Sequence, residues 1–170
     1  MKTLAATLAA AALLAAAATA PARAQDDGAL VSFEVMKPDV ALRLAQGALE
    51  RCRDEGAQIA VAVVDRFGVL QVVLRDRYAG AHTPETARRK AWTAVSFRND
   101  TLALAEVAKP GGEAYGANFI EDALMLGGGV PVEAAGSIVG GVGVSGAPGG
   151  ALDDACARAG IEAVMDDLAF

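Results

Sequence analysis

The strongest constraint on the fold is a pair of β-rich segments that are only three residues apart. Residues 59–65 read IAVAVVD and residues 69–76 read VLQVVLRD, with RFG between them. Valine and isoleucine favour extended backbone, and a connection this short joins two strands as a hairpin. A second pair of strands is predicted at residues 130–132 and 137–144. Two hairpins in place of long crossovers predict an antiparallel sheet.

Helices are predicted on both sides of these strand pairs. Pro38 suits the first turn of a helix that ends at Gly56, and Thr83 is the predicted cap of a second helix, with Pro84 at its first position. A short helix is expected over residues 101–107, a helical turn or loop over residues 118–126, and a closing amphipathic helix over residues 153–168. This order predicts one α+β domain with helices packed on an antiparallel sheet.

A glycine motif near the end of the chain has the letters of a dinucleotide-binding turn. Gly141, Gly143 and Gly146 match G-x-G-x-x-G. In such a turn the third glycine opens a helix directly. Here residues 147–150 separate Gly146 from the predicted helix, so the spacing excludes a nucleotide site. We expect these glycines to mark the close approach of another backbone, from a helix or from a neighbouring subunit.

The first 24 residues predict export. Lys2 precedes an uncharged Ala/Leu run over residues 4–20, and Ala22 and Ala24 have the spacing of a signal-peptidase site. We expect residues 1–24 to be a signal peptide and residues 25–170 to form a single periplasmic or extracellular domain. The apolar run is short and Ala-rich, so membrane insertion is not expected.

The overall charge argues against one class of partner. The chain has 15 Lys and Arg against 21 Asp and Glu. Binding of nucleic acid requires a basic surface that neutralises phosphates, so nucleic acid is not an expected partner.

Two cysteines lie on the apolar stripes of predicted helices. Cys52 belongs to the first helix and Cys156 to the last. Two interpretations stay open, because export favours a disulfide while unpaired cysteine also packs as a small hydrophobic residue. There is no C-x-x-C motif, and neither cysteine is a predicted catalytic residue.

Five segments in a fixed order identify a family. They read VAVVDRFG at 61–68, ETARRKAWTA at 85–94, GGGVPV at 127–132, VGGVGVSGAPGG at 139–150 and DDACARAG at 153–160. Together they resemble the GlcG/HbpS family of haem-binding proteins, and the signal peptide points to its secreted HbpS-like branch. The resemblance implies a profilin-like fold and homo-oligomers, often octamers. It also implies binding of haem and free iron, slow haem degradation under oxidative conditions, and contact with a membrane sensor protein.

Candidate haem ligands lie in one predicted loop. Haem iron takes an axial His, Cys, Met or Tyr. The single histidine is His82, and Tyr78 lies four residues before it. His82 is the first candidate for cofactor and metal binding and Tyr78 the second, while a solvated loop histidine is the alternative.

Basic residues near this loop are candidates for binding the haem propionates. Arg75, Arg77 and Arg89 are the predicted residues, and Arg89 is expected to face the loop that contains His82. The alternative is a solvated or inter-subunit ion-pair surface.

Free iron prefers carboxylate ligands, but the candidate carboxylates in this sequence have no diagnostic spacing. They are Asp76, Glu85, Glu113, Glu121 and Asp122.

Three functions are compatible with these features. The first is an exported haem-binding protein that sequesters, carries or slowly degrades haem. The second is an oligomeric interaction or sensor-accessory module without a cofactor, and the third a small-molecule or corrinoid-associated accessory protein. No catalytic residue is predicted, since Ser145 has no His or Asp partner in its sequence context.

Overall fold

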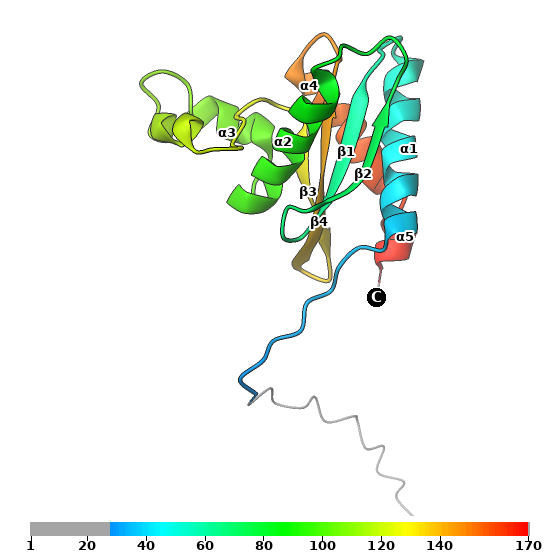
Figure 1. Ribbon diagram of the computed structural model, residues 1–170, viewed down its shortest axis with the longest axis vertical. Coiled ribbons are helices and arrows are strands. Elements are labelled where there is room, and N and C mark those ends of the chain that lie inside the picture. Colours follow the sequence, from blue (N-terminus) through cyan, green and yellow to red (C-terminus); the bar gives the residue numbers. More distant parts are fainter. Residues whose placement is uncertain (1–27, 170) are drawn as a thin grey trace, which may run out of the picture. The chain divides into compact units, whose positions relative to one another are not determined.

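The computed structural model describes residues 28–169 (Figure 1), and the predicted signal peptide lies outside the described residues. Residues 28–32 belong to a separate unit from the domain that begins at Phe33 and have no helix or strand. The domain consists, in chain order, of α1 (Pro38–Asp54), β1 (Ala60–Asp65), β2 (Leu70–Arg75), α2 (Thr83–Phe97), α3 (Thr101–Val107), the 3₁₀ helix η1 (Tyr115–Phe119), β3 (Gly129–Ala134), β4 (Ser137–Ser145), α4 (Gly150–Glu162) and α5 (Met165–Leu168).

The strands pair as the two hairpins predict. Their order is β2-β1-β4-β3 and every pairing is antiparallel. The β3–β4 hairpin turns at Ala135 and Gly136, which both have positive φ, 48° and 75°. Two such residues match the twist of the flanking strands. The α+β class is therefore confirmed.

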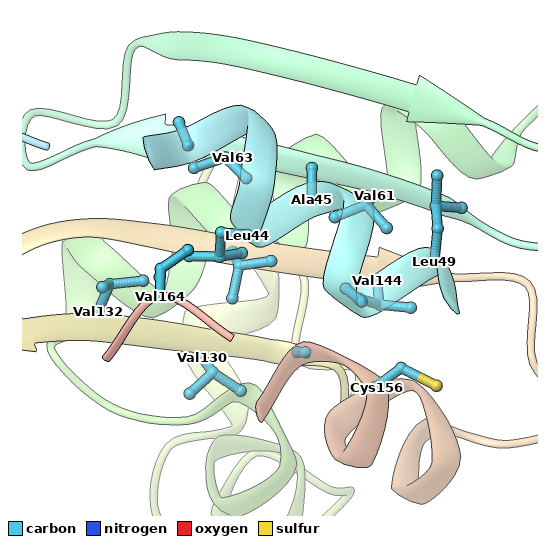
Figure 2. Close-up of a cluster of buried hydrophobic side chains, with 14 of the residues drawn as sticks. Leu44, Ala45, Leu49, Val61, Val63, Val130, Val132, Val144, Cys156 and Val164 are labelled. Atoms are coloured by element: carbon cyan, nitrogen blue, oxygen red, sulfur yellow. The ribbon is translucent and has the colours of Figure 1, made fainter. Parts of the chain in front are cut away.

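One face of the sheet packs on α1 and α4. Valines from three strands form one buried cluster there with residues of α1 and α4, and Leu44 lies near its centre (Figure 2). Cys52 of α1 and Cys156 of α4 form a disulfide in this layer. Both cysteines are fully buried. The structure thus decides between the two interpretations of the cysteines in favour of the disulfide.

The other face of the sheet packs on α2 through unusually small residues. A Cβ atom added to Gly143 would lie 2.0 Å from the carbonyl oxygen of Ala87, and one added to Gly129 would lie 2.3 Å from that of Lys90. On the neighbouring strand β1, Ala60 and Ala62 contact Ala87 of the helix. The glycines therefore allow a helix to approach the strands closely, which is one of the two explanations that the sequence favoured.

Two predicted helix boundaries are wrong. The closing helix begins at Gly150 instead of residue 153 and ends at Glu162, before the separate short helix α5. The break places Val164 in the core, where it is 1% exposed. Thr83 is the first residue of α2 and not its cap, because its hydroxyl donates to the Gly80 carbonyl (2.8 Å).

Across residues 28–169, no helix is long and apolar enough to cross a membrane.

The contact between α2 and β4 gives a first testable prediction. Gly143→Ala should lower the free energy of unfolding by about 1–3 kcal/mol or more, because the new methyl group meets backbone that cannot move without separating the layers. Urea denaturation measures this change. Gly116→Ala is the matched control, since a Cβ at Gly116 meets nothing within 4 Å. Equal stability of the two variants would contradict the proposed close packing.

Candidate functional site

The segment between β2 and α2 is held rigidly at its start. Asp76, which is buried, accepts hydrogen bonds from the Arg53 guanidinium (2.9 Å from Nε) and from the Ile59 amide (3.3 Å). The Arg75 Nε donates to the Ala79 carbonyl (3.1 Å). These contacts fix the backbone of residues 75–79, and the side chains that follow are presented from a defined position.

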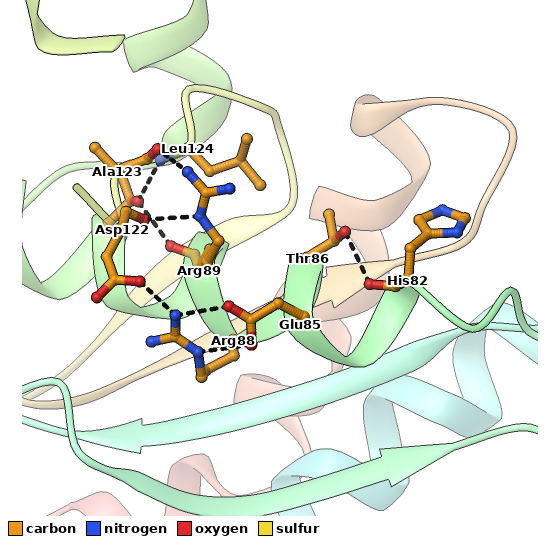
Figure 3. A network of polar contacts seen from close by, with 9 residues as sticks. His82, Glu85, Thr86, Arg88, Arg89, Asp122, Ala123 and Leu124 are labelled. Atoms are coloured by element: carbon orange, nitrogen blue, oxygen red, sulfur yellow. Dashed lines mark hydrogen bonds and ion pairs between the residues drawn. The ribbon is translucent and has the colours of Figure 1, made fainter. Parts of the chain in front are cut away.

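His82 stands at the end of this segment with a free imidazole. Its ring lies against Gly80, where an added Cβ would be 2.7 Å from Cε1 and 2.9 Å from Nδ1. The backbone carbonyl of His82 accepts from the Thr86 hydroxyl (3.0 Å), as Figure 3 shows. Within residues 28–169, neither ring nitrogen makes a hydrogen bond. Both nitrogens are therefore available to a ligand.

A pocket of about 360 Å³ opens beside this histidine. One side comes from the loop before α2 and the other from the segment that joins β4 to α4. Its lining residues are Gln58, Tyr78, Gly80, His82, Thr83, Lys90, Leu126, Ser145, Gly146, Ala147, Gly149, Gly150 and Asp153. Tyr78 is 77% exposed. The structure thus brings the two candidate axial ligands, Tyr78 and His82, to one pocket.

A buried ion pair lies in the wall of the pocket. The Lys90 ammonium donates to Asp153 Oδ2 (2.8 Å) and to the Val144 carbonyl (2.9 Å), and Lys90 is 1% exposed. Asp153 Oδ1 accepts from the Ala147 amide (3.0 Å). Burial lowers the pKa of Lys90 and raises the pKa of Asp153, and the attraction between the two groups opposes both shifts. The pair fixes the β4–α4 connection relative to α2.

The three arginines proposed for the propionates have other contacts. Arg75 bonds to the backbone of its own loop, and the Arg77 guanidinium lies 5.2 Å from the centre of the Tyr78 ring. Arg89 donates to the carbonyls of Asp122 (3.3 Å) and Ala123 (2.7 Å), and Figure 3 shows these contacts farther along α2, away from His82.

The expectation that Arg89 faces the His82 loop is therefore wrong. Residues 122–124 have no strand partner, so their backbone groups need side-chain partners, and Arg89 satisfies two of the carbonyls. Among the described residues, Arg75, Arg77 and Arg89 are all absent from the pocket lining. Their binding of a propionate stays a prediction.

The candidate carboxylates for iron do not gather into a metal site in the described residues. Asp76 pairs with Arg53, while Glu85 and Asp122 both accept hydrogen bonds from Arg88. The hydrogen bond from Arg88 lowers the pKa of Glu85. Between residues 28 and 169, no group of three or more His, Cys, Asp or Glu side chains is placed to hold a metal ion.

Sequence reasoning missed the ion pair and the position of Ser145. Lys90 was not among the candidate residues, although it falls on the same helix stripe as the buried Ala87 and Ala94. A lysine on an apolar stripe is a signal of a buried partner. Ser145 was considered only as a nucleophile, and no local pattern shows that its hydroxyl lines a pocket.

Comparisons with known proteins establish the family. A family model described as "Haem degrading protein HbpS-like" matches residues 36–162. The chain therefore belongs to the HbpS-like family. The crystal structure of a double mutant of HbpS from Streptomyces reticuli is 38% identical, with a TM-score of 0.75, over 91% of this chain and 97% of that one.

Two further relatives describe the range of the family. The crystal structure of a PduOC–haem complex is 30% identical, with a TM-score of 0.71, over 76% of this chain and 94% of that one. The corrinoid adenosyltransferase PduO of Salmonella typhimurium (strain LT2) is 33% identical over 106 residues, which are 61% of this chain and 32% of PduO. The chain thus spans about a third of the length of this curated relative.

The buried ion pair gives a second testable prediction. Lys90→Met leaves the Asp153 carboxylate buried without its cation and should lower the free energy of unfolding by about 3–5 kcal/mol. Adding Asp153→Asn should recover part of this loss, because the amide oxygen still accepts from Ala147 and has no charge. Chemical denaturation of both variants measures the difference.

Lys109→Met is the control for this experiment. Lys109 pairs with Glu106 on the surface, and its side chain is 64% exposed. An exposed pair contributes at most about 1 kcal/mol, so this variant should unfold close to the unmutated protein. A double variant that is as unstable as Lys90→Met would contradict the ion-pair explanation.

Proposed function

We propose that this protein is an exported haem-binding protein that sequesters, carries or slowly degrades haem. The observation with the most weight is the free imidazole of His82 at the mouth of the pocket. Membership of a family described as haem-degrading and similarity to a protein crystallised with haem support the same ligand.

The donor set fits an axial ligand for haem. Haem iron accepts a neutral imidazole nitrogen, and His82 keeps both ring nitrogens unbonded within the described chain. Gly80 limits the positions of the ring, because the imidazole packs directly on its backbone. His82 would hold the iron, and Tyr78, beside it, would cover part of the ligand or replace His82 at the iron. When bound, haem supplies the redox chemistry that degradation requires.

The proposal also includes export and self-association. Export rests on the predicted signal peptide. Self-association is supported by exposed apolar side chains on the segment from α3 to residue 126, which projects from the sheet and its helices in Figure 1. They are Leu102, Val107, Tyr115, Phe119, Ile120 and Leu126. Several exposed apolar side chains on one projecting segment are compatible with a protein–protein contact surface. A membrane sensor protein and free iron are further proposed partners, and they rest on the family resemblance alone.

A haemin titration tests the central proposal. The purified protein should give a Soret band that saturates at a fixed stoichiometry. His82→Ala should shift the band and weaken binding by about tenfold or more, since a lost contact of about 1.4 kcal/mol changes the affinity tenfold. Gln46→Ala, on the exposed side of α1, is the control and should bind as the unmutated protein does.

Two other outcomes separate the remaining functions. An unchanged haemin spectrum at stoichiometric haemin, together with an intact oligomer in size-exclusion chromatography, would favour an interaction module without a cofactor. Saturable binding of hydroxocobalamin in place of haemin would favour a corrinoid-associated role, which the similarity to a corrinoid adenosyltransferase supports. Either result contradicts the haem proposal.

A further inference from the structure

Ser145 places a hydroxyl without a hydrogen bond in the wall of the pocket. It is the last residue of β4, is 5% exposed and lines the pocket. Its Oγ has no hydrogen-bond partner anywhere in residues 28–169. The Ser145 Oγ is not one of the described side-chain atoms that are both buried and unpartnered, so the hydroxyl is accessible from the pocket although the residue as a whole is buried. A hydroxyl without an internal partner on a pocket wall is free to donate to a molecule bound in the pocket.

The N-terminus of α4 opens into the same pocket. Its cap residue, Gly149, has no side chain that could accept from the helix, and Gly149 and Gly150 both line the pocket. Their N–H groups donate to no acceptor in the described part of the chain. The first N–H groups of a helix have partial positive charge and favour anions. This end of the pocket therefore offers hydrogen-bond donors.

The charged groups nearby do not block an anion. Asp153 is negative, but its two oxygens already accept from Lys90 and from the Ala147 amide. The Lys90 ammonium uses two of its three N–H groups, toward Asp153 and Val144. The positive charge of the Lys90 ammonium offsets the negative charge of the Asp153 carboxylate. The N–H groups at the start of α4 and the imidazole of His82 therefore remain available as hydrogen-bond donors.

We propose that Ser145, Gly149 and Gly150 form an oxyanion-binding subsite for a carboxylate or a phosphate. The Ser145 hydroxyl and the two backbone N–H groups donate to the oxygens, and Lys90 and Asp153 position the connecting segment without direct contact. If the occupant is a propionate of haem, the inference rests on the haem-binding function. A free carboxylate or phosphate is the other source of the same chemistry.

Comparing the binding of haemin with that of its dimethyl ester shows whether a haem propionate or a free anion occupies the subsite. Esterification removes the propionate charges and leaves the macrocycle and iron unchanged. Ser145→Ala should weaken haemin binding by about tenfold, the usual effect of losing a hydrogen bond to a charged group. Binding of the dimethyl ester should be the same in Ser145→Ala and the unmutated protein. Ser137→Ala, an exposed serine on the same strand, is the matched control and should change neither affinity.

Binding of small anions is measured on the unmutated protein, so this test needs no variant. Addition of inorganic phosphate or acetate should shift the NMR amide signals of Gly149 and Gly150 saturably, while the signal of Gly116 stays constant. Haemin binding that is insensitive to both Ser145→Ala and esterification, without amide shifts, would overturn the subsite and leave the haem proposal intact. Amide shifts without any haemin binding would overturn the haem proposal and assign the subsite to a free anion.

Discussion

The close contact between α2 and the sheet determines where the site can form. Gly129 and Gly143 leave no room for a side chain between the helix and the strands. At this separation the backbone of α2 lies almost on β3 and β4, and Lys90 projects toward the end of β4 instead of into solvent. With larger residues at the glycines, the same lysine would lie farther from its two acceptors, and the ion pair would not form in this geometry.

The ion pair then connects parts of the domain that lie on opposite faces of the sheet. Lys90 belongs to α2, and Asp153 belongs to α4, which packs with α1 on the other face. Their contact passes around the end of β4, where the Val144 carbonyl accepts a second hydrogen bond from the ammonium. The pocket is located at this end. Its wall is formed by the connection between β4 and α4, which has no regular structure and needs the pair to fix it.

The fold was predictable from local sequence, and the pocket only in part. Short turns between β-rich segments determine antiparallel pairing, because a few residues cannot carry a crossover. His82 and Tyr78 were predictable as neighbours because they share one loop. The contact of Lys90 with Asp153 was not predictable. It joins residues 63 positions apart, and it depends on how closely α2 packs against the sheet. The direction of Arg89 was also not predictable. Its guanidinium points away from the His82 loop because it donates hydrogen bonds to backbone carbonyls in residues 122–124, far along the chain.

The disulfide between Cys52 and Cys156 has a consequence for the pocket as well as for the core. Cys156 lies on α4, the helix whose first residues form one wall of the pocket. In an oxidising compartment this wall is covalently tethered to α1. In a reducing compartment α4 would be held by packing and by its ion pairs, Lys90–Asp153 and Arg158–Asp100. The redox state of the compartment in which the protein folds therefore affects how firmly the pocket wall is held, since Gly149 and Gly150 lie within about two helical turns of Cys156.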